Sequence, residues 1–185
     1  MRQVEGKPVM SSVEAVRCGV KAAREAGRPL GILFVCLGNI CRSPAAQGVM
    51  ERMVRQAGLS DKIKLDSAGF YGGHRGDLPD ARMRSAAAAR GLTLTHRSRT
   101  VRDADFLDFD IIIGMDDTNI DSLHRQALTD DADRKIVRMT DFAIAHPNAT
   151  HVPDPYWEGA EGFELVLDML EDACQGLLDE IRKCM

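Results

Sequence analysis

From Leu30 onward, short runs rich in β-branched and aliphatic residues alternate with stretches of helical length. This alternation constrains the fold, because neighbouring parallel strands can be joined only through crossover connections, which are usually helices. We expect strands over residues 30–35, 62–66, 110–115 and 135–139. We expect helices over residues 44–57, 80–90, 116–127 and the last 25 residues of the chain. With right-handed crossovers, these elements predict a small parallel sheet between two helical layers.

The predicted fold class is α/β: a three-layer, flavodoxin-like, doubly wound sheet of about four parallel strands with helices on both faces. A chain of 185 residues, 44% of them hydrophobic, can bury one sizeable core and is short for two domains. Residues 1–28 stand apart, because Ser11 and Glu14 are spaced as in a capping box and Gly27 closes a helical pattern. We predict an N-terminal helical extension over residues 1–28 and one main domain over residues 29–185.

The composition disfavours several classes of partner. Acidic residues number 28 and basic residues 24, and the resulting net charge of -4 disfavours a large nucleic-acid or anionic-membrane surface. No stretch has the roughly 18 consecutive apolar residues of a membrane span, and the N-terminus lacks a secretory pattern, so a cytoplasmic protein is expected. The five cysteines are scattered and lack CxxC or HxxxH spacing. We therefore expect neither a disulfide framework nor a bound metal. Oligomeric state does not follow from the sequence.

One loop has residues suited to binding phosphate. Directly after the first predicted strand, where a parallel sheet places its ligand, comes the stretch Cys36-Leu37-Gly38-Asn39-Ile40-Cys41-Arg42-Ser43-Pro44. Gly38 and Asn39 tolerate positive φ, so consecutive N–H groups can form an anion-binding nest. Pro44 suits a first helical turn, which points the positive end of a helix dipole at the loop. The residues expected to bind phosphate are Leu37, Gly38, Asn39, Ile40, Cys41, Arg42 and Ser43.

Three side chains of this loop suggest covalent chemistry on the bound phosphate. The field of the loop and helix stabilises a thiolate, which makes Cys36 a candidate nucleophile. Arg42 supplies a planar fork for two phosphoryl oxygens, and the Ser43 hydroxyl can stabilise the sulfur when it leaves. A lone cysteine at such a place is more often a buried strand-end residue. The Cys-x5-Arg-Ser spacing between a strand and a helix favours the catalytic interpretation.

A second motif offers the proton donor that a thiolate attack on phosphorus requires. Asp154 lies between Pro153 and Pro155, which restrict the backbone around it, and Tyr156 and Trp157 follow directly. The two aromatic residues could form the wall of a pocket for a ring. Considered alone, Pro-Asp-Pro is more often a plain turn. Together with the Cys36 loop, it predicts a general acid at Asp154.

The two motifs, 118 positions apart, resemble those of the low-molecular-weight protein tyrosine phosphatases, and the resemblance covers roughly residues 30–184. It implies a hydrolase that removes phosphate from phosphotyrosine proteins or peptides without a cofactor. The implied catalytic residues are Cys36, Arg42 and Asp154. In that family a serine and a histidine hold the loop asparagine. Ser67, in Asp66-Ser67-Ala68-Gly69, and His96 are the matching residues here, although His96 could also be an ordinary surface residue.

The chain departs from the family at the substrate cleft. Many relatives have a large residue where this sequence has Gly72-Gly73, and there it forms one wall of the cleft. Phe70 and Tyr71 lie just upstream and are expected to substitute for that wall. Tyr156 and Trp157 are expected to form the other. His74 either lines the entrance or is simply a solvent-exposed loop residue.

Other activities are possible on the same fold. An arsenate reductase needs a cysteine relay, but Cys174 and Cys184 fall on the last predicted helix and not in a loop near residues 80–100. Phosphoarginine phosphatases of this family have threonine where Ile40 stands, so Ile40 favours phosphotyrosine. A phosphopeptide-binding module without turnover would not need the full set of Cys36, Arg42 and Asp154. Cys41 is equally well interpreted as a disulfide partner of Cys36 or as a core residue.

Overall fold

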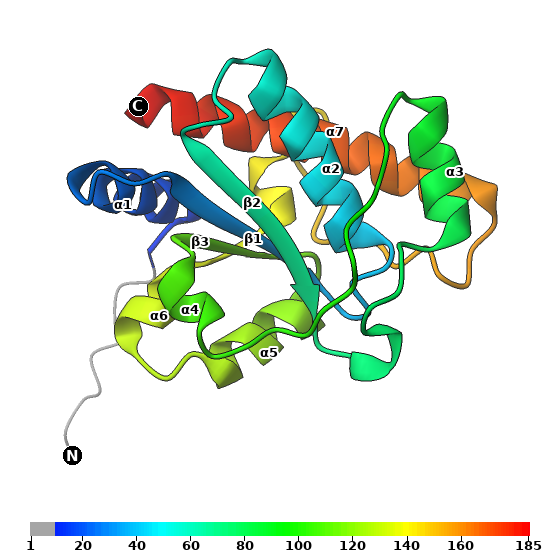
Figure 1. The fold of residues 1–185 in the computed structure, drawn as a ribbon, viewed down its shortest axis with the longest axis horizontal. Coiled ribbons are helices and arrows are strands. Elements are labelled where there is room, and N and C mark those ends of the chain that lie inside the picture. Colours follow the sequence, from blue (N-terminus) through cyan, green and yellow to red (C-terminus); the bar gives the residue numbers. More distant parts are fainter. Residues whose placement is uncertain (1–9) are drawn as a thin grey trace.

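Four parallel strands form the centre of the protein, in the order β2-β1-β3-β4, as a computed structural model describing residues 10–185 shows (Figure 1). The strands are β1 (Leu30–Cys36), β2 (Ile63–Gly69), β3 (Ile111–Gly114) and β4 (Ile136–Arg138). The chain moves from β1 to one neighbour, β2, and then crosses to β3 on the other side of β1. This order confirms the predicted doubly wound sheet and places its topological switch point at the end of β1.

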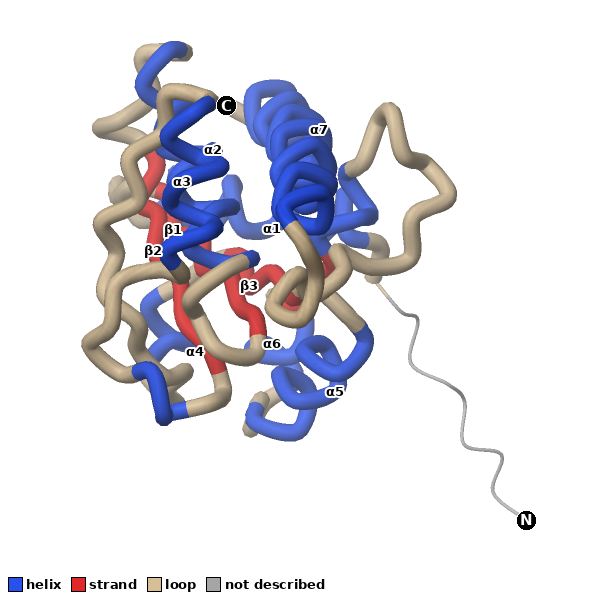
Figure 2. Tube along the Cα trace, turned by 90° about the vertical axis from the view of Figure 1, so that its right-hand side faces the viewer, coloured by secondary structure: helices blue, strands red, loops and turns tan. Residues whose placement is uncertain are grey.

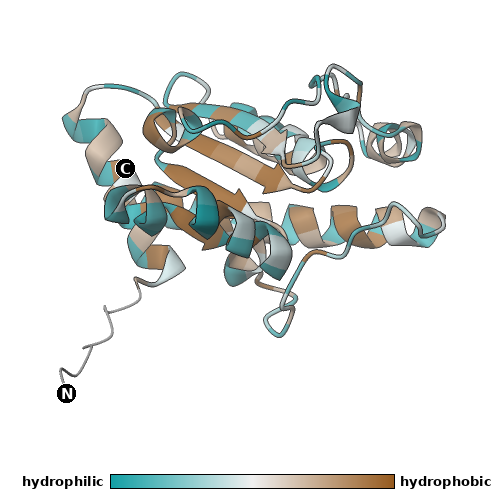
Figure 3. Cartoon of the chain, turned by 90° about the horizontal axis from the view of Figure 1, so that it is seen from below, coloured by the Kyte–Doolittle hydropathy of each residue, from teal (hydrophilic) through white to brown (hydrophobic). Residues whose placement is uncertain are grey.

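Strand β1 is buried on both faces, as its uninterrupted apolar sequence predicts. Ile32 and Phe34 point into the larger core, whereas Leu33 and Val35 point into the smaller one on the opposite face. Alternate side chains of a strand project to opposite faces, so one strand supplies both cores. Figure 3 shows the hydrophobic strands lying between helices whose outer surfaces are largely hydrophilic.

Helices cover both faces of the sheet (Figure 2). The larger core contains side chains of four helices: α1 (Ser12–Glu25), α2 (Arg42–Gln56), α3 (Ala81–Ala89) and α7 (Ala160–Cys184). The smaller core lies beneath three short helices: α4 (Asp105–Asp108), α5 (Asp117–Gln126) and α6 (Asp130–Arg134). Two 3-10 turns, η1 (Gly72–His74) and η2 (Met139–Phe142), complete the described elements. The three-layer arrangement is therefore confirmed.

The predicted elements all exist, with bounds that differ by a few residues. The largest difference is in β2, which runs on to Gly69 because its register with β1 continues to the pair Cys36–Gly69. The sequence did not predict α4 and α6, whose four and five residues are too few to show a helical period. No helix within residues 10–185 is both long enough and apolar enough to cross a membrane.

Helix α1 begins as predicted. Ser11 is its N-cap, and the reciprocal bonds between Ser11 and Glu14 form a capping box. Val16 and Val20 are buried in the larger core, so this helix packs directly on the main domain. Residues 1–9 of the predicted extension lie outside the described residues.

Candidate active site

The loop of residues 36–43, which the sequence predicts to bind phosphate and which we call the phosphate-binding loop, leaves the sheet at its switch point. Cys36 is the last residue of β1, and Arg42 is the first residue of α2. The loop therefore has β2 on one side, β3 on the other and a helix N-terminus behind it. This is where a doubly wound sheet binds ligands.

The backbone of the loop is arranged to bind an anion. Its carbonyl groups accept hydrogen bonds from Phe70 N and Tyr71 N to Leu37 O (both 2.8 Å), from Ser98 Oγ to Gly38 O (3.2 Å) and from Asp80 N to Ile40 O (2.8 Å). By contrast, the N–H groups of residues 37–41 have no acceptor within the part of the chain that the structure describes. Asn39 has a φ of 54°, and it is the only non-glycine residue among those described with positive φ. Bound carbonyls and available N–H groups are what an anion-binding nest requires.

The sulfur of Cys36 has a hydroxyl partner. Ser43 Oγ lies 3.0 Å from Cys36 Sγ and 3.3 Å from the carbonyl oxygen of Ala68. The side-chain amide of Asn39 donates to the same hydroxyl at 2.8 Å. Because this bond uses a lone pair of Ser43 Oγ, the single hydroxyl proton is left to donate either to the Ala68 carbonyl or to the sulfur. Asn39 thus orients the group that can stabilise a thiolate.

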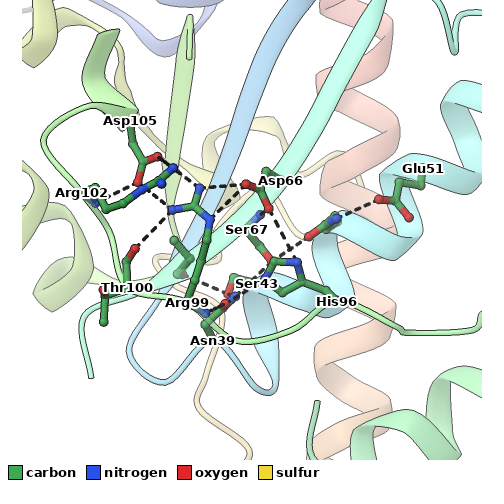
Figure 4. A network of polar contacts seen from close by, with 12 residues as sticks. Asn39, Ser43, Glu51, Asp66, Ser67, His96, Arg99, Thr100, Arg102 and Asp105 are labelled. Atoms are coloured by element: carbon green, nitrogen blue, oxygen red, sulfur yellow. Dashed lines mark hydrogen bonds and ion pairs between the residues drawn. The ribbon is translucent and has the colours of Figure 1, made fainter. Parts of the chain in front are cut away.

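Asn39 itself is held on both ends of its amide. Its nitrogen donates to Ser67 Oγ at 3.0 Å, and its oxygen lies 3.0 Å from His96 Nε2 (Figure 4). Arg99 N also donates to that oxygen, at 2.9 Å. The predicted contacts of Ser67 and His96 with the loop asparagine are therefore present, whereas the Arg99 contact was not predicted.

Gly69 lets the phosphate-binding loop pack tightly against β2. A Cβ atom at this position would lie 2.6 Å from Leu37 O and 2.8 Å from Asn39 N. Real Cβ atoms essentially never approach backbone atoms so closely. Glycine at position 69 is therefore needed for the observed loop position.

Arg42 is almost fully buried and lies between two carboxylates. Nη1 contacts Asp116 Oδ2 at 2.5 Å, and Nη2 contacts Asp154 Oδ2 at 2.9 Å. Nη1 also donates to the carbonyl of Val152 at 3.2 Å. Burial opposes a charged guanidinium, but Cys36 and the two carboxylates outweigh it and raise the pKa of Arg42 above its ordinary value. A fixed positive charge is thus placed beside the loop.

Asp116 was missed by sequence reasoning. It follows β3, so it lies at the same sheet edge as Cys36, and it also caps α5 by accepting from Asn119 N at 2.8 Å. Its position directly after a buried strand was the available signal. Asp116 and Asp154 come from separate segments, and both orient Arg42.

The Asp154 segment reaches the site through backbone contacts. Val152 N donates to Met115 O at 2.8 Å, which attaches the segment to the end of β3. The other carboxylate oxygen of Asp154 accepts from Tyr156 N at 3.3 Å. The side chain of Asp154 is 42% exposed, so it stands at the boundary between the buried loop and solvent.

Four rings, which we call the aromatic row, lie above the loop: Tyr71, His74, Tyr156 and Trp157. Neighbouring ring centroids are 5.3 Å apart for Tyr71 and His74, 6.5 Å for His74 and Tyr156, and 4.9 Å for Tyr156 and Trp157. His74 therefore connects Tyr71 with the predicted pair of Tyr156 and Trp157, and its ring also lies beside Gly38. Tyr71 is 55% exposed and Trp157 90% exposed. Phe70 packs against the smaller core instead.

The remaining cysteines have different environments. Cys41 is a buried free thiol, and burial raises its pKa well above the ordinary value. Cys174 is fully buried in α7, and Cys184 lies near the end of the same helix. All five cysteines are free in the structure.

An α/β fold with a Cys-x5-Arg loop at its switch point is typical of a cysteine-dependent phosphatase. Comparison with known proteins agrees with this class. The family model described as "Low molecular weight phosphotyrosine protein phosphatase" matches residues 31–185. A relative from Streptomyces coelicolor, named low molecular weight protein-tyrosine-phosphatase, is 39% identical over 154 residues, covering 82% of this chain and 93% of the relative. The chain therefore belongs to the low molecular weight phosphotyrosine protein phosphatase family and is a hydrolase.

Solved structures show the same similarity. A protein tyrosine phosphatase from Entamoeba histolytica with Hepes in its active site superimposes with a TM-score of 0.80 at 42% identity, covering 83% of this chain and 97% of that chain. A Drosophila arginine phosphatase superimposes with a TM-score of 0.75 at 32% identity, covering 80% and 95%. The fold is thus shared by a tyrosine phosphatase and an arginine phosphatase.

Proposed function

We propose that this chain hydrolyses phosphotyrosine in proteins or peptides through a covalent cysteinyl-phosphate, with Cys36, Arg42 and Asp154 as its catalytic residues. The observation that supports this most strongly is the convergence of three groups on one loop. Cys36 Sγ has the Ser43 hydroxyl as a partner, the loop N–H groups are available, and Arg42 contacts Asp154. Each group has a distinct part in a two-step displacement.

In the first step, the Cys36 thiolate attacks phosphorus and the bond to the tyrosyl oxygen breaks. The N–H groups of residues 37–43 and the Arg42 guanidinium bind the equatorial oxygens, whose charge they stabilise. The bound phosphate replaces Asp154 as the hydrogen-bond partner of Arg42 Nη2, while Asp116 remains the partner of Nη1. Asp154, in its protonated form, gives its proton to the leaving oxygen.

In the second step, water replaces the sulfur. The Asp154 carboxylate takes a proton from water, whose oxygen attacks phosphorus as the phosphorus–sulfur bond breaks. The departing thiolate of Cys36 receives a hydrogen bond from Ser43 Oγ. Inorganic phosphate then leaves, and the thiolate is ready for another cycle.

The aromatic row supports phosphotyrosine as the substrate. Tyr71 and Tyr156 stand on either side of His74 above the loop, and flat rings there suit a phenyl ring. Phosphoserine would leave the exposed rings without a partner.

Phosphoarginine is the second candidate substrate, because the Drosophila arginine phosphatase has the same fold at 32% identity. Ile40 is a buried residue of the loop and stands where phosphoarginine phosphatases of this family have threonine, which argues for phosphotyrosine. Replacing Ile40 with threonine should raise the ratio of phosphoarginine to phosphotyrosine hydrolysis. A wild-type enzyme that already prefers phosphoarginine would change the substrate proposal and leave the Cys36 chemistry intact.

The Cys36→Ser variant tests the nucleophile. Its hydroxyl is a far weaker nucleophile, so hydrolysis of p-nitrophenyl phosphate should fall below detection. Binding of inorganic phosphate, measured by calorimetry, should persist because the loop N–H groups and Arg42 are unchanged. Residual hydrolysis near the wild-type rate would exclude Cys36 as the nucleophile.

We further propose that the protein is located in the cytoplasm. Five free cysteines, one of them a proposed nucleophile, suit this reducing compartment.

We propose residues 29–185 as the phosphatase domain and residues 1–28 as an added N-terminal element. The family match, which begins at residue 31, supports this limit.

A further inference from the structure

The side-chain amide of Asn39 is contacted from outside the loop by three residues: Ser67, His96 and Arg99. Ser67 comes from β2, whereas His96 and Arg99 come from the segment that follows α3. The Ser67 hydroxyl accepts from the amide nitrogen, and the other two residues contact the amide oxygen. The positive φ of Asn39 therefore depends on groups that two separate segments must bring together.

A single carboxylate, that of Asp66, connects all three of these residues (Figure 4). Oδ1 of Asp66 accepts from Ser67 N at 2.8 Å and lies 3.6 Å from His96 Nδ1. Oδ2 accepts from Arg99 Nη2 at 2.8 Å and from Arg99 Nε at 3.1 Å. Asp66 thus contacts each of the three outside residues, through atoms other than those that reach Asn39.

The far side of Arg99 is fixed as well. Nη1 of Arg99 contacts Asp105 Oδ2 at 2.9 Å, and Asp105 has no exposed surface. Arg102 N also donates to Asp105, at 2.8 Å. Because its guanidinium is held between two carboxylates, Arg99 has little freedom to follow other movements.

We propose that Asp66 is a positioning residue for catalysis, which acts through Asn39. Its carboxylate joins β2 to the segment of residues 96–99, and this join holds the Asn39 amide in place. Asn39 in turn directs the Ser43 hydroxyl toward the Cys36 sulfur and keeps the loop N–H groups turned to the anion. The inference rests on the proposed function of Cys36, because it concerns the same site.

Two explanations of Asp66 predict different kinetics. If Asp66 only stabilised the fold, its loss would lower thermal stability and leave phosphate affinity unchanged in the folded fraction. If it positions Asn39, its loss weakens phosphate binding and lowers kcat in a protein that is still folded. A residue that acts through Asn39 must also lose its effect once Asn39 is replaced.

The test uses Asp66→Asn in two backgrounds, the wild type and Asn39→Ala. In the wild type, we expect Asp66→Asn to lower kcat for p-nitrophenyl phosphate by about 10- to 100-fold, the usual size of such outer-shell effects. Phosphate affinity measured by calorimetry should fall in parallel. In the Asn39→Ala background, the same change should alter kcat by less than about twofold.

Asp168→Asn is the matched control, because it also removes a carboxylate that pairs with an arginine, Arg90, but on α7. Its kcat and phosphate affinity should equal those of the wild type. If Asp66→Asn does not fold, Arg99→Lys replaces it, since lysine lacks the fork that binds Asp66 but keeps the main-chain donor to Asn39. The expected change has the same direction.

Equal effects of Asp66→Asn in both backgrounds would overturn the proposal, as would unchanged phosphate affinity in the wild-type background. Failure of the proposed function looks different. In that case the wild type itself would not hydrolyse p-nitrophenyl phosphate. Calorimetry with phosphate would still report whether Asp66 acts on the loop through Asn39.

Discussion

The phosphate-binding loop and the aromatic row lie at the same edge of the sheet but are held in different ways. The loop residues Asn39, Arg42 and Ser43 are at most 2% exposed, and each has at least two polar partners. In the aromatic row, Trp157 is 90% exposed, and its ring meets that of Tyr156 in a T-shaped arrangement. The loop is thus fixed before phosphate arrives, whereas the row can adjust to a substrate.

This difference suggests that the loop determines the rate of the chemical step and that the aromatic row determines which substrates bind. A fixed set of N–H groups needs no rearrangement when charge develops on the phosphoryl group, which favours the transition state. The exposed rings of the aromatic row can change position to fit substrates of different shape. Substitutions in the loop should therefore affect every substrate, and substitutions in the row should affect only some.

Asp154 joins the two regions, and its replacement should have the largest effect. Asp154→Asn cannot donate a proton, so kcat/KM for phenyl phosphate, which reports the first step, should fall by about 100- to 10,000-fold. The fall in kcat/KM should be much smaller for p-nitrophenyl phosphate, whose leaving group needs little protonation. Steady-state kinetics with both substrates gives the comparison. Equal losses of kcat/KM for the two substrates would contradict the assignment of Asp154 as the general acid.

Gly69→Ala should disturb the loop next most strongly. Its new methyl group would meet Leu37 O and Asn39 N, so the loop must move, and kcat should fall by about 100-fold for all substrates. Gly72→Ala, between the row residues Tyr71 and His74, is the matched control, because its methyl group would meet only Thr100 Cγ2, at an ordinary 3.6 Å. Similar kcat values for the two variants would show that the loop is not fixed as described.

Asp105, which holds Arg99 near the loop, makes the stability of the protein depend on pH. Burial opposes its charge, but Arg99 and Arg102 outweigh this and lower the pKa of Asp105 below its ordinary value. The unfolded chain therefore takes up this proton first as the pH falls. The stabilisation is complete above roughly pH 4 and is lost as the pH falls through the folded pKa.

Chemical denaturation of the wild type and Asp105→Asn between neutral pH and pH 3 measures this contribution. The wild type should be the more stable protein at neutral pH, and the difference should shrink in acid. If the free energies of unfolding of the two proteins differed by the same amount at every pH, Asp105 would contribute no charge-dependent stabilisation.

Trp157→Ala should have the smallest effect and the most selective one. The ring is exposed, so the free energy of unfolding should change by less than about 0.5 kcal/mol. Hydrolysis of p-nitrophenyl phosphate should be nearly unchanged, whereas kcat/KM for a phosphotyrosine peptide should fall by roughly 2- to 10-fold. Equal changes in kcat/KM for both substrates would show that Trp157 affects catalysis by the loop and not the choice of substrate.

The sequence predicted what is local in the chain. The apolar run of β1 and the contiguous loop after it could be recognised because their residues are neighbours. The partners of Arg42 and Arg99 were harder to predict, since Asp116 and Asp66 are 74 and 33 residues away from them. Such pairs depend on the order of strands in the sheet, which only the folded structure gives.

The central claim is that phosphate passes through the sulfur of Cys36. Rapid quenching of Asp154→Asn during turnover of p-nitrophenyl phosphate, followed by peptide mass spectrometry, tests it directly. We predict one phosphoryl group, attached to the peptide that contains Cys36, and its absence in Cys36→Ser. A phosphoryl group on any other residue would contradict the account.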